Sequence, residues 1–367
     1  MEQSSRKPSP AEQLAATRSA NTASASSATT SSTTGTNPSS GERRATERSV
    51  QDLTIKAASS EAVSVYPKLA TYVDGVLTEL RVTSTLIGNL IYKNNVIDYC
   101  PRKLYETYLT GNNSNAPTPS MQKGLYFESR LLGKGRTGSL FELPTLKNGK
   151  QSIDQVRIDA QVKMAEMAFK MYGMEIIKEG PQCNVQVEAS MLLDYAQYPD
   201  IKLTLNGGMD IVTPINVPKT DYNYYAAVVD IKLTMSRFNE HGKYCWGLPQ
   251  YMDVTQGVLY SALTGLPFFY NVFDYKEKTG NGHLLLPVAT MAMFPNGPTS
   301  LEEEEGFNMA KQRDSDLRVN LKTVVELVVG MDAEKYPEKP SYNNCDNCPV
   351  SKLAGGPCEY VNFIKKI

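Results

Sequence analysis

VVDIKLT, residues 228–234, alternates apolar and charged side chains and predicts a β-strand with one chemical face. Because successive side chains of a strand point to opposite faces, Asp230 and Lys232 should lie on the same side, roughly 7 Å apart. The apolar side chains should fill the opposite side: Val229, Ile231 and Leu233. An Asp-x-Lys pair on a strand can also be an ordinary surface ion pair, so its meaning depends on what surrounds it.

A second acid, Asp210, lies twenty positions upstream in NGGMDIV, residues 206–212. A pair of carboxylates is the hard oxygen ligand set that Mg²⁺ or Mn²⁺ prefers, and a lysine beside such an ion can orient or deprotonate an attacking water. The apolar side chains before Asp210 occupy odd positions, whereas Asp210 occupies an even one. We therefore expect a bulge or bend at Gly207 and Gly208 that turns the acid towards the face that carries Asp230.

Composition and charge restrict the possible classes of protein. The chain has 367 residues, of which 41% are hydrophobic, enough for one large domain or two small ones. It has two histidines, His241 and His283, which argues against most histidine-based zinc hydrolases and leaves no obvious histidine base. The sequence contains neither a Walker A nor a dinucleotide-binding motif, so ATP-driven and hydride-transfer chemistry have no support. With a net charge of −1, the chain should bind nucleic acid in a local groove beside a metal ion rather than on a broad basic face.

The chain divides into four stretches. Residues 1–50 are rich in Ser, Thr and Ala without an apolar period, which predicts a disordered tail. We expect an N-terminal helical segment at residues 51–120, the α/β core at residues 121–300, and a C-terminal helix and cysteine cluster at residues 301–367 that complete the same domain. No apolar run suits a secretion signal or a bilayer span, so we expect a cytoplasmic, intracellular protein without membrane partners.

Periodic patterns predict the individual elements. Apolar residues at helical spacing occur in four stretches: 65–97, 101–109, 154–172 and 249–265. Branched, aromatic or alternating residues predict five strands: 185–193, 201–212, 224–234, 268–275 and 283–294. The helix at 154–172 offers these side chains for packing: Val156, Val162, Met164, Met167, Ala168 and Met171. Ser300 and Glu303 form a capping box before an acidic helical turn.

Four short motifs follow one another along the chain: GLYFE at 124–128, MD ending at Asp210, DIK at 230–232 and Q-x-x-x-Y at 256–260. With the order helix, three strands, helix, two strands, they resemble the PD-(D/E)XK nuclease superfamily, and more closely the RecB-type nuclease domain. The resemblance covers about residues 80–360. It implies a restriction-endonuclease-like α/β fold with an αβββαβ core, to which further helices are added.

The resemblance assigns roles to the strand motifs. It implies that Asp210 and Asp230 bind the metal ion and that the main-chain carbonyl of Ile231 is a third protein ligand. Lys232 would position or activate the attacking water.

Two helical motifs complete the implied site. Gln256 and Tyr260 lie one helical turn apart and would support the site and contact the substrate, although exposed Gln/Tyr pairs at this spacing are common. Glu128 stands where the RecB pattern commonly has histidine and resembles the acid of viral recombination exonucleases. Its carboxylate could hold the same metal ion or a second one, or it could be an ordinary first-turn acid of its helix.

Four of the six cysteines form a separate pattern: Cys100, Cys345, Cys348 and Cys358. Their layout resembles that of the AddB nuclease domain and the CRISPR-associated RecB-like exonucleases, and implies a [4Fe-4S] cluster that ties the two ends of the domain together. A structural Zn²⁺ fits the C-x-x-C equally well, and the absence of any metal is the third alternative. Cys183 and Cys245 lack this context and should be small buried apolar side chains.

Taken together, the motifs predict a metal-dependent DNA nuclease, in first place an exonuclease, that hydrolyses phosphodiester bonds with Mg²⁺ or Mn²⁺. The expected partners are DNA, single-stranded or at ends, and proteins of recombination, repair or CRISPR adaptation. Two alternatives stay open. One is a structure-selective endonuclease, and the other is a catalytically silent DNA-binding or assembly subunit that uses the fold and its cysteine clamp as a scaffold.

Overall fold

The structure is a computed structural model that describes residues 56–57, 68–90, 100–111, 118–133, 141–146, 149–217, 223–234, 254–275, 283–284 and 289–330, and the single residues Cys345, Cys348 and Cys358. The tail predicted at residues 1–50 lies outside these residues, as does Cys245. Within the described part, no helix combines the length and the apolar character needed to cross a membrane.

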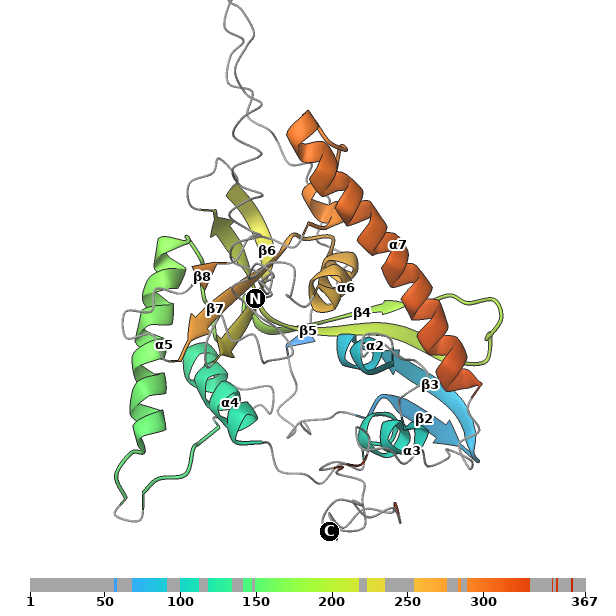
Figure 1. Cartoon of the computed structure of the whole chain (residues 1–367), viewed down its shortest axis with the longest axis horizontal. Coiled ribbons are helices and arrows are strands. Elements are labelled where there is room, and N and C mark those ends of the chain that lie inside the picture. Colours follow the sequence, from blue (N-terminus) through green and yellow to red (C-terminus); the bar gives the residue numbers. More distant parts are fainter. Residues whose placement is uncertain are drawn as a thin grey trace, which may run out of the picture. The chain divides into compact units, whose positions relative to one another are not determined.

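A mixed β-sheet forms the centre of the fold (Figure 1). Its strands in the described residues are β1 (Lys56–Ala57), β2 (Ala70–Val73), β3 (Val76–Val82), β4 (Val185–Leu192), β5 (Lys202–Asn216), β6 (Asn223–Thr234), β7 (Phe268–Asp274) and β8 (His283–Leu284). They lie in the order β1-β4-β5-β6-β7-β8, and β3 connects β2 to β5. β5 is antiparallel to both β4 and β6, whereas β6 and β7 are parallel. The predicted α/β class is therefore confirmed.

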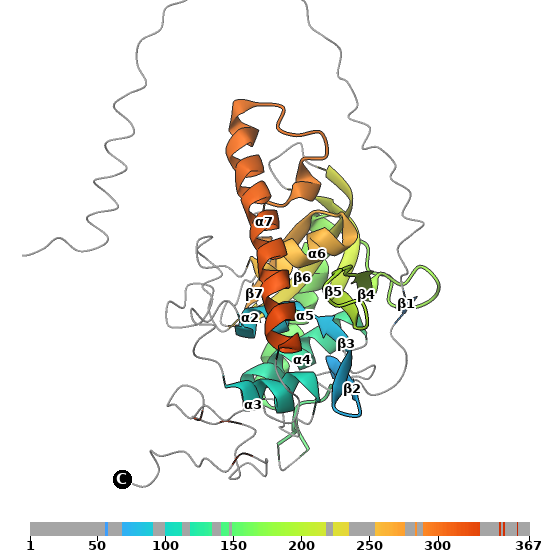
Figure 2. The same ribbon diagram turned by 90° about the vertical axis from the view of Figure 1, so that its right-hand side faces the viewer.

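Helices cover both faces of the sheet (Figures 1 and 2). They are α2 (Ser84–Leu90), α3 (Pro101–Leu104), the π-helical turn η2 (Tyr105–Leu109), α4 (Pro119–Leu132), α5 (Ile153–Met171), α6 (Thr255–Thr264), the 3₁₀ turn η4 (Met291–Met293) and α7 (Leu301–Val329). α2, α6 and α7 contribute to one hydrophobic core, and α4 and α5 contribute to a second. The long strands at the centre separate the two.

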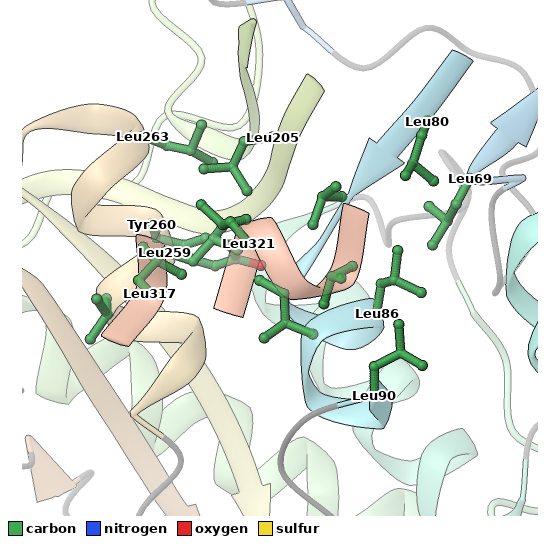
Figure 3. Close-up of a cluster of buried hydrophobic side chains, with 14 of the residues drawn as sticks. Leu69, Leu80, Leu86, Leu90, Leu205, Leu259, Tyr260, Leu263, Leu317 and Leu321 are labelled. Atoms are coloured by element: carbon green, nitrogen blue, oxygen red, sulfur yellow. The ribbon is translucent and has the colours of Figure 1, made fainter. Parts of the chain in front are cut away.

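The first core gathers leucines from α2, β3, β5, α6 and α7 around Tyr260 (Figure 3). Alternation along β7 shows that the two cores lie on opposite faces of the sheet. Phe268 and Tyr270 belong to the first core, whereas Phe269 and Phe273 belong to the second. Because every residue of β7 is buried, this strand is covered on both faces.

Caps mark three of the helix boundaries, and of the capping box predicted at Ser300 and Glu303 the structure shows the bond to the Ser300 side chain, while the Glu303 side chain accepts from Thr299. Ser152 caps α5, accepting a hydrogen bond from the Gln155 backbone nitrogen at 3.2 Å while the Gln155 side chain accepts one from the Ser152 nitrogen at 2.6 Å. Ser300 caps α7 by accepting from the Glu303 nitrogen at 3.3 Å. Gly265 ends α6 in the left-handed region, with φ at 68°.

The helix predicted at residues 65–97 is wrong for its first half. Residues 70–82 form the hairpin β2–β3, and the two turn residues Asp74 and Gly75 have φ values of 51° and 80°. Asp-Gly is a strong signal for such a two-residue turn, and it outweighs the helical spacing of the surrounding valines and leucines. The helix begins only at Ser84.

Three further predictions need correction. Val156, Met167 and Met171 of α5 are exposed, because the buried side of this helix runs instead through Ile158, Ala165 and Phe169. The strand predicted at 283–294 extends over only His283–Leu284 in the described residues, and Met291–Met293 form a 3₁₀ turn. The helix predicted from Pro249 begins at Thr255, with Val254 as its N-cap.

Candidate active site

The candidate site lies where β5 changes neighbours along one edge. β3 pairs with β5 from Lys202 to Leu205, and β6 pairs with it from Ile211 onward. The intervening stretch, residues 206–210, therefore faces a fork between β3 and β6. Where strands separate in this way, backbone groups need hydrogen-bond partners other than a neighbouring strand.

Asp210 supplies one such partner. Its Oδ2 accepts a hydrogen bond from the backbone nitrogen of Ile231 at 2.8 Å. In β6, Ile231 lies just beyond Val229, which is paired with Ile211 of β5. The Asp210 side chain, only 1% exposed, thus continues the connection between the two strands and lies beside the DIK motif.

Asp230 and Lys232 project from the same face of β6 and form an ion pair between Oδ2 and Nζ. Asp230 is fully buried, whereas 26% of the Lys232 side chain is exposed. Val229 and Ile231 belong to the second core and Leu233 packs against it, so the predicted alternation is confirmed. Since an isolated buried carboxylate is costly, the lysine stabilises Asp230 from the solvent side.

Gln256 of α6 forms hydrogen bonds with both Asp230 and Lys232. The Nε2 of Gln256 donates a hydrogen bond to Asp230 Oδ1, and its Oε1 accepts one from Lys232 Nζ at 3.3 Å. Nε2 also donates to the hydroxyl of Tyr260 at 3.3 Å, one turn further along the helix. The structure therefore brings Asp230, Lys232, Gln256 and Tyr260 together in one contact network.

Tyr260 also accounts for the glycine at position 207. A Cβ on Gly207 would lie 2.7 Å from Cε1 of Tyr260 and 2.9 Å from Cδ1 of Leu263, so the close approach of α6 requires glycine. Of the bulge or bend predicted at Gly207 and Gly208, the bulge is wrong, because β4 and β5 stay in one register along this stretch.

The alternation of side chains between the two faces of the sheet shifts by one residue at Asp210. Met209 belongs to the core beneath α6, whereas Ile211 belongs to the core beneath α4 and α5. β4 makes the same change between Val187 and Val185. Gln186, the residue between them, has φ at 52°, a region that residues other than glycine rarely adopt.

Glu128 reaches the site from α4. Its Oε1 accepts a hydrogen bond from Nε2 of Gln186 at 2.7 Å. The pairing of Val185 with Ile211 and of Val187 with Met209 sets Gln186 opposite Asp210. Glu128 is thus connected to the fork through Gln186, whereas the predicted cysteine ligands lie outside this contact network.

Two neighbours of the site are residues that the sequence did not single out. Gln186 is a polar residue within an apolar run, which is an ordinary pattern for a half-buried strand. Tyr270 of β7 lies opposite Asp230, and its ring centre is 5.7 Å from Lys232 Nζ, a cation–π distance. The parallel pairing of β6 with β7 creates this contact, and no local sequence motif predicts it.

A second polar group lies between α4, α5 and the end of β7. The Tyr275 hydroxyl donates a hydrogen bond to Asp154, and Lys123 forms an ion pair with that acid at 2.9 Å. These two contacts hold the pKa of Asp154 below its usual value. Burial, followed by the bond to Asp154, raises the pKa of Tyr275. Arg157 lies 5.8 Å from the same ring, which gives this corner two cations for one acid.

Five of the six cysteines lie within the described residues. Cys348 and Cys358 are buried against each other, and the Cys348 nitrogen donates to the Cys345 carbonyl at 3.2 Å. Cys100 is the N-cap of α3 and is half-buried. Cys183 is half-buried against the second core.

The donor set fits a hard divalent cation in chemical type. Asp210, Asp230 and Glu128 offer carboxylates, and Ile231 offers a main-chain carbonyl beside them. Across the described ranges, however, no three His, Cys, Asp or Glu side chains converge closely enough to form a metal site. This holds for the carboxylates and for the cysteines.

Comparison of the sequence with protein-family models found no match, and comparison with curated proteins found none either.

Proposed function

We propose that this chain is a metal-dependent DNA nuclease of the PD-(D/E)XK superfamily, RecB-like, that acts as an exonuclease. The observation that carries the proposal is the fully buried Asp230 paired with Lys232 and bound by Gln256 at a fork in the sheet. A merely structural ion pair would be cheaper at the surface, and apolar residues would be cheaper in the core. Buried charges held in this way are typical of catalytic sites.

Each side chain of the network has a task in this proposal. The Lys232 side chain is the partly exposed member of the pair, so its ammonium would orient the attacking water, or its neutral amine would deprotonate it. Gln256 fixes both ends of the Asp230–Lys232 pair and limits their movement. Tyr260 contacts the Gln256 amide from within the first core and supports its orientation.

Asp210, Asp230 and Glu128, with the carbonyl of Ile231, would hold Mg²⁺ or Mn²⁺, either as one ion or as two. Such an ion, when bound, polarises the scissile phosphate and stabilises charge on the leaving oxygen. Asp210 is prepared for this role because its bond to the Ile231 nitrogen already orients one of its oxygens.

We also propose a [4Fe-4S] cluster on Cys100, Cys345, Cys348 and Cys358, with structural Zn²⁺ as the alternative. The contact between Cys348 and Cys358 and the hydrogen bond from the Cys348 nitrogen to the Cys345 carbonyl support this ligand set. Its role would be structural, because a cluster that joins residues so far apart in sequence restricts the unfolded chain.

The test uses end-labelled single-stranded and double-stranded DNA, linear and circular, with Mg²⁺ or Mn²⁺. We expect linear DNA to be degraded from its ends and circular DNA to survive. Cleavage of the circles would favour the structure-selective endonuclease. Asp230→Ala should abolish cleavage while the protein remains folded. Retained cleavage by this variant would contradict the proposed site, and a wild-type protein that binds DNA without cutting it would favour the silent scaffold.

A further inference from the structure

Gln186 is the one non-glycine residue with positive φ inside a strand of the described part of the chain. Such a conformation is strained for a residue with a Cβ, and it persists only where the surroundings impose it. Its neighbours Val185 and Val187 point into different cores, so the strand turns over at this residue. The positive φ of Gln186 therefore determines the direction in which its side chain points.

That direction connects two elements of the proposed site. The Gln186 amide donates to Glu128 of α4 at 2.7 Å, while the backbone of Gln186 lies opposite Asp210 of β5. In a regular strand Val185 and Val187 would point to the same face of the sheet. They could not then lie in two different cores. The left-handed conformation of Gln186 allows Val185 and Val187 to face different cores. It also allows the Gln186 amide to reach α4.

We infer that Gln186 is a positioning residue that fixes the direction of the Glu128 carboxylate from the strand position opposite Asp210, and so sets the affinity of the proposed site for its divalent cation. This inference rests on the proposed function. An amide donor orients a carboxylate without competing for the cation by charge. Outer-shell partners of this kind typically change metal affinity by about tenfold to a hundredfold.

Three variants isolate this role. Gln186→Gly tolerates the left-handed backbone and lacks the amide, whereas Gln186→Asn also tolerates it but is one methylene too short to reach Glu128. Glu128→Gln removes the carboxylate that Gln186 is inferred to hold. Glu188→Gln changes an exposed residue of the same strand and is the matched control.

The experiment measures Mn²⁺ binding to the full chain by isothermal titration calorimetry, with DNA cleavage and thermal unfolding measured in parallel. We expect Gln186→Gly and Gln186→Asn to weaken Mn²⁺ binding by about tenfold or more, and Glu188→Gln to leave it unchanged. In the Glu128→Gln background, Gln186→Gly should have little further effect, because the two residues act as one unit. If Gln186→Gly fails to fold, Gln186→Asn answers the same question.

Outcomes that overturn the inference differ from those that overturn the function. Wild-type Mn²⁺ affinity in both Gln186 variants, alongside a weakened Glu128→Gln, would remove Gln186 from the site and leave the nuclease proposal intact. Additive losses in the double variant would show that Gln186 does not act through Glu128. A wild-type chain that neither binds Mn²⁺ nor cleaves DNA would overturn the proposed function itself.

Discussion

The carboxylate of Asp210 accepts a hydrogen bond from the backbone nitrogen of Ile231 at 2.8 Å, where β5 and β6 cease to pair. One side chain thus has two duties, because it satisfies a buried donor and presents an acid to the site. Substitutions can separate these duties, since an amide oxygen keeps the acceptor and removes the charge.

Asp210→Asn should therefore keep the stability of the protein but lower cleavage by about 10²- to 10³-fold, as for other lost electrostatic contacts to a transition state. Asp210→Ala should also lower the free energy of unfolding by about 1 to 3 kcal/mol, because the Ile231 N–H is left unsatisfied. Urea unfolding and single-turnover cleavage of labelled DNA measure the two effects. Equal stability of the two variants would show that the hydrogen bond is unimportant.

Gly207→Ala should destabilise the protein by about 1 to 3 kcal/mol, because its Cβ would overlap Tyr260 and Leu263. Cleavage should fall as well, since relief of the overlap moves α6 and with it Gln256. Gly208→Ala is the matched control, as a Cβ there meets no atom of the described residues within 4 Å. Thermal unfolding of the pair compares them directly, and a Gly208→Ala variant as unstable as Gly207→Ala would contradict the packing explanation.

Asn271 of β7 is fully buried opposite Ile231, and within the described ranges neither its Nδ2 nor its Oδ1 has a hydrogen-bond partner. Asn271→Val should raise the free energy of unfolding by about 1 kcal/mol, because it removes an unsatisfied polar group from a strand. Asn271→Asp should do the opposite by burying an unpaired charge. Urea unfolding near neutral pH measures both, and a destabilised Asn271→Val would indicate a polar role for this side chain.

Burial and the hydrogen bond to Asp159, 2.9 Å from the phenol oxygen, raise the pKa of Tyr126 to about 12. An unfolded tyrosine ionises near pH 10, so the neutral phenol favours the folded state fully below that pH. This contribution is lost as pH rises from about 10 to about 12. Tyr126→Phe should show a smaller fall in unfolding free energy across this window than the wild type. Tyr225→Phe, at a side chain that is 86% exposed, is the control and should keep the wild-type fall.

Cys348→Ser should remove bound metal from the anaerobically purified protein, whereas Cys183→Ser should retain it. Cys348 contacts Cys358, but the Sγ of Cys183 donates to the Lys178 carbonyl at 3.3 Å and lies apart from the proposed ligand set. Elemental analysis separates iron from zinc, and a brown colour with broad visible absorbance identifies the cluster. Equal metal content in both variants would contradict the cysteine assignment.

Local sequence patterns predicted the parts of the site that depend on one element. The period of a strand set Asp230 and Lys232 on one face, and the helical turn set Gln256 near Tyr260. The same reasoning failed at residues 70–82, where helical spacing and an Asp-Gly turn competed and the turn prevailed. It failed again at Gly207, because glycine is needed there for a helix that arrives from elsewhere in the chain.

The sequence by itself determined which residues carry charge, the type of most strands and helices outside residues 70–82, and where several helices begin, because these properties depend on neighbours a few positions away. Only the tertiary structure decided that β5 divides its edge between β3 and β6, that Asp210 binds Ile231 across that fork, and that Gln186 connects Glu128 to it. The physical reason is that strand pairing and core packing join residues far apart in sequence. The backbone hydrogen bonds of all these residues must be satisfied in the same structure. The sequence of one segment does not show which distant segment will supply its partners.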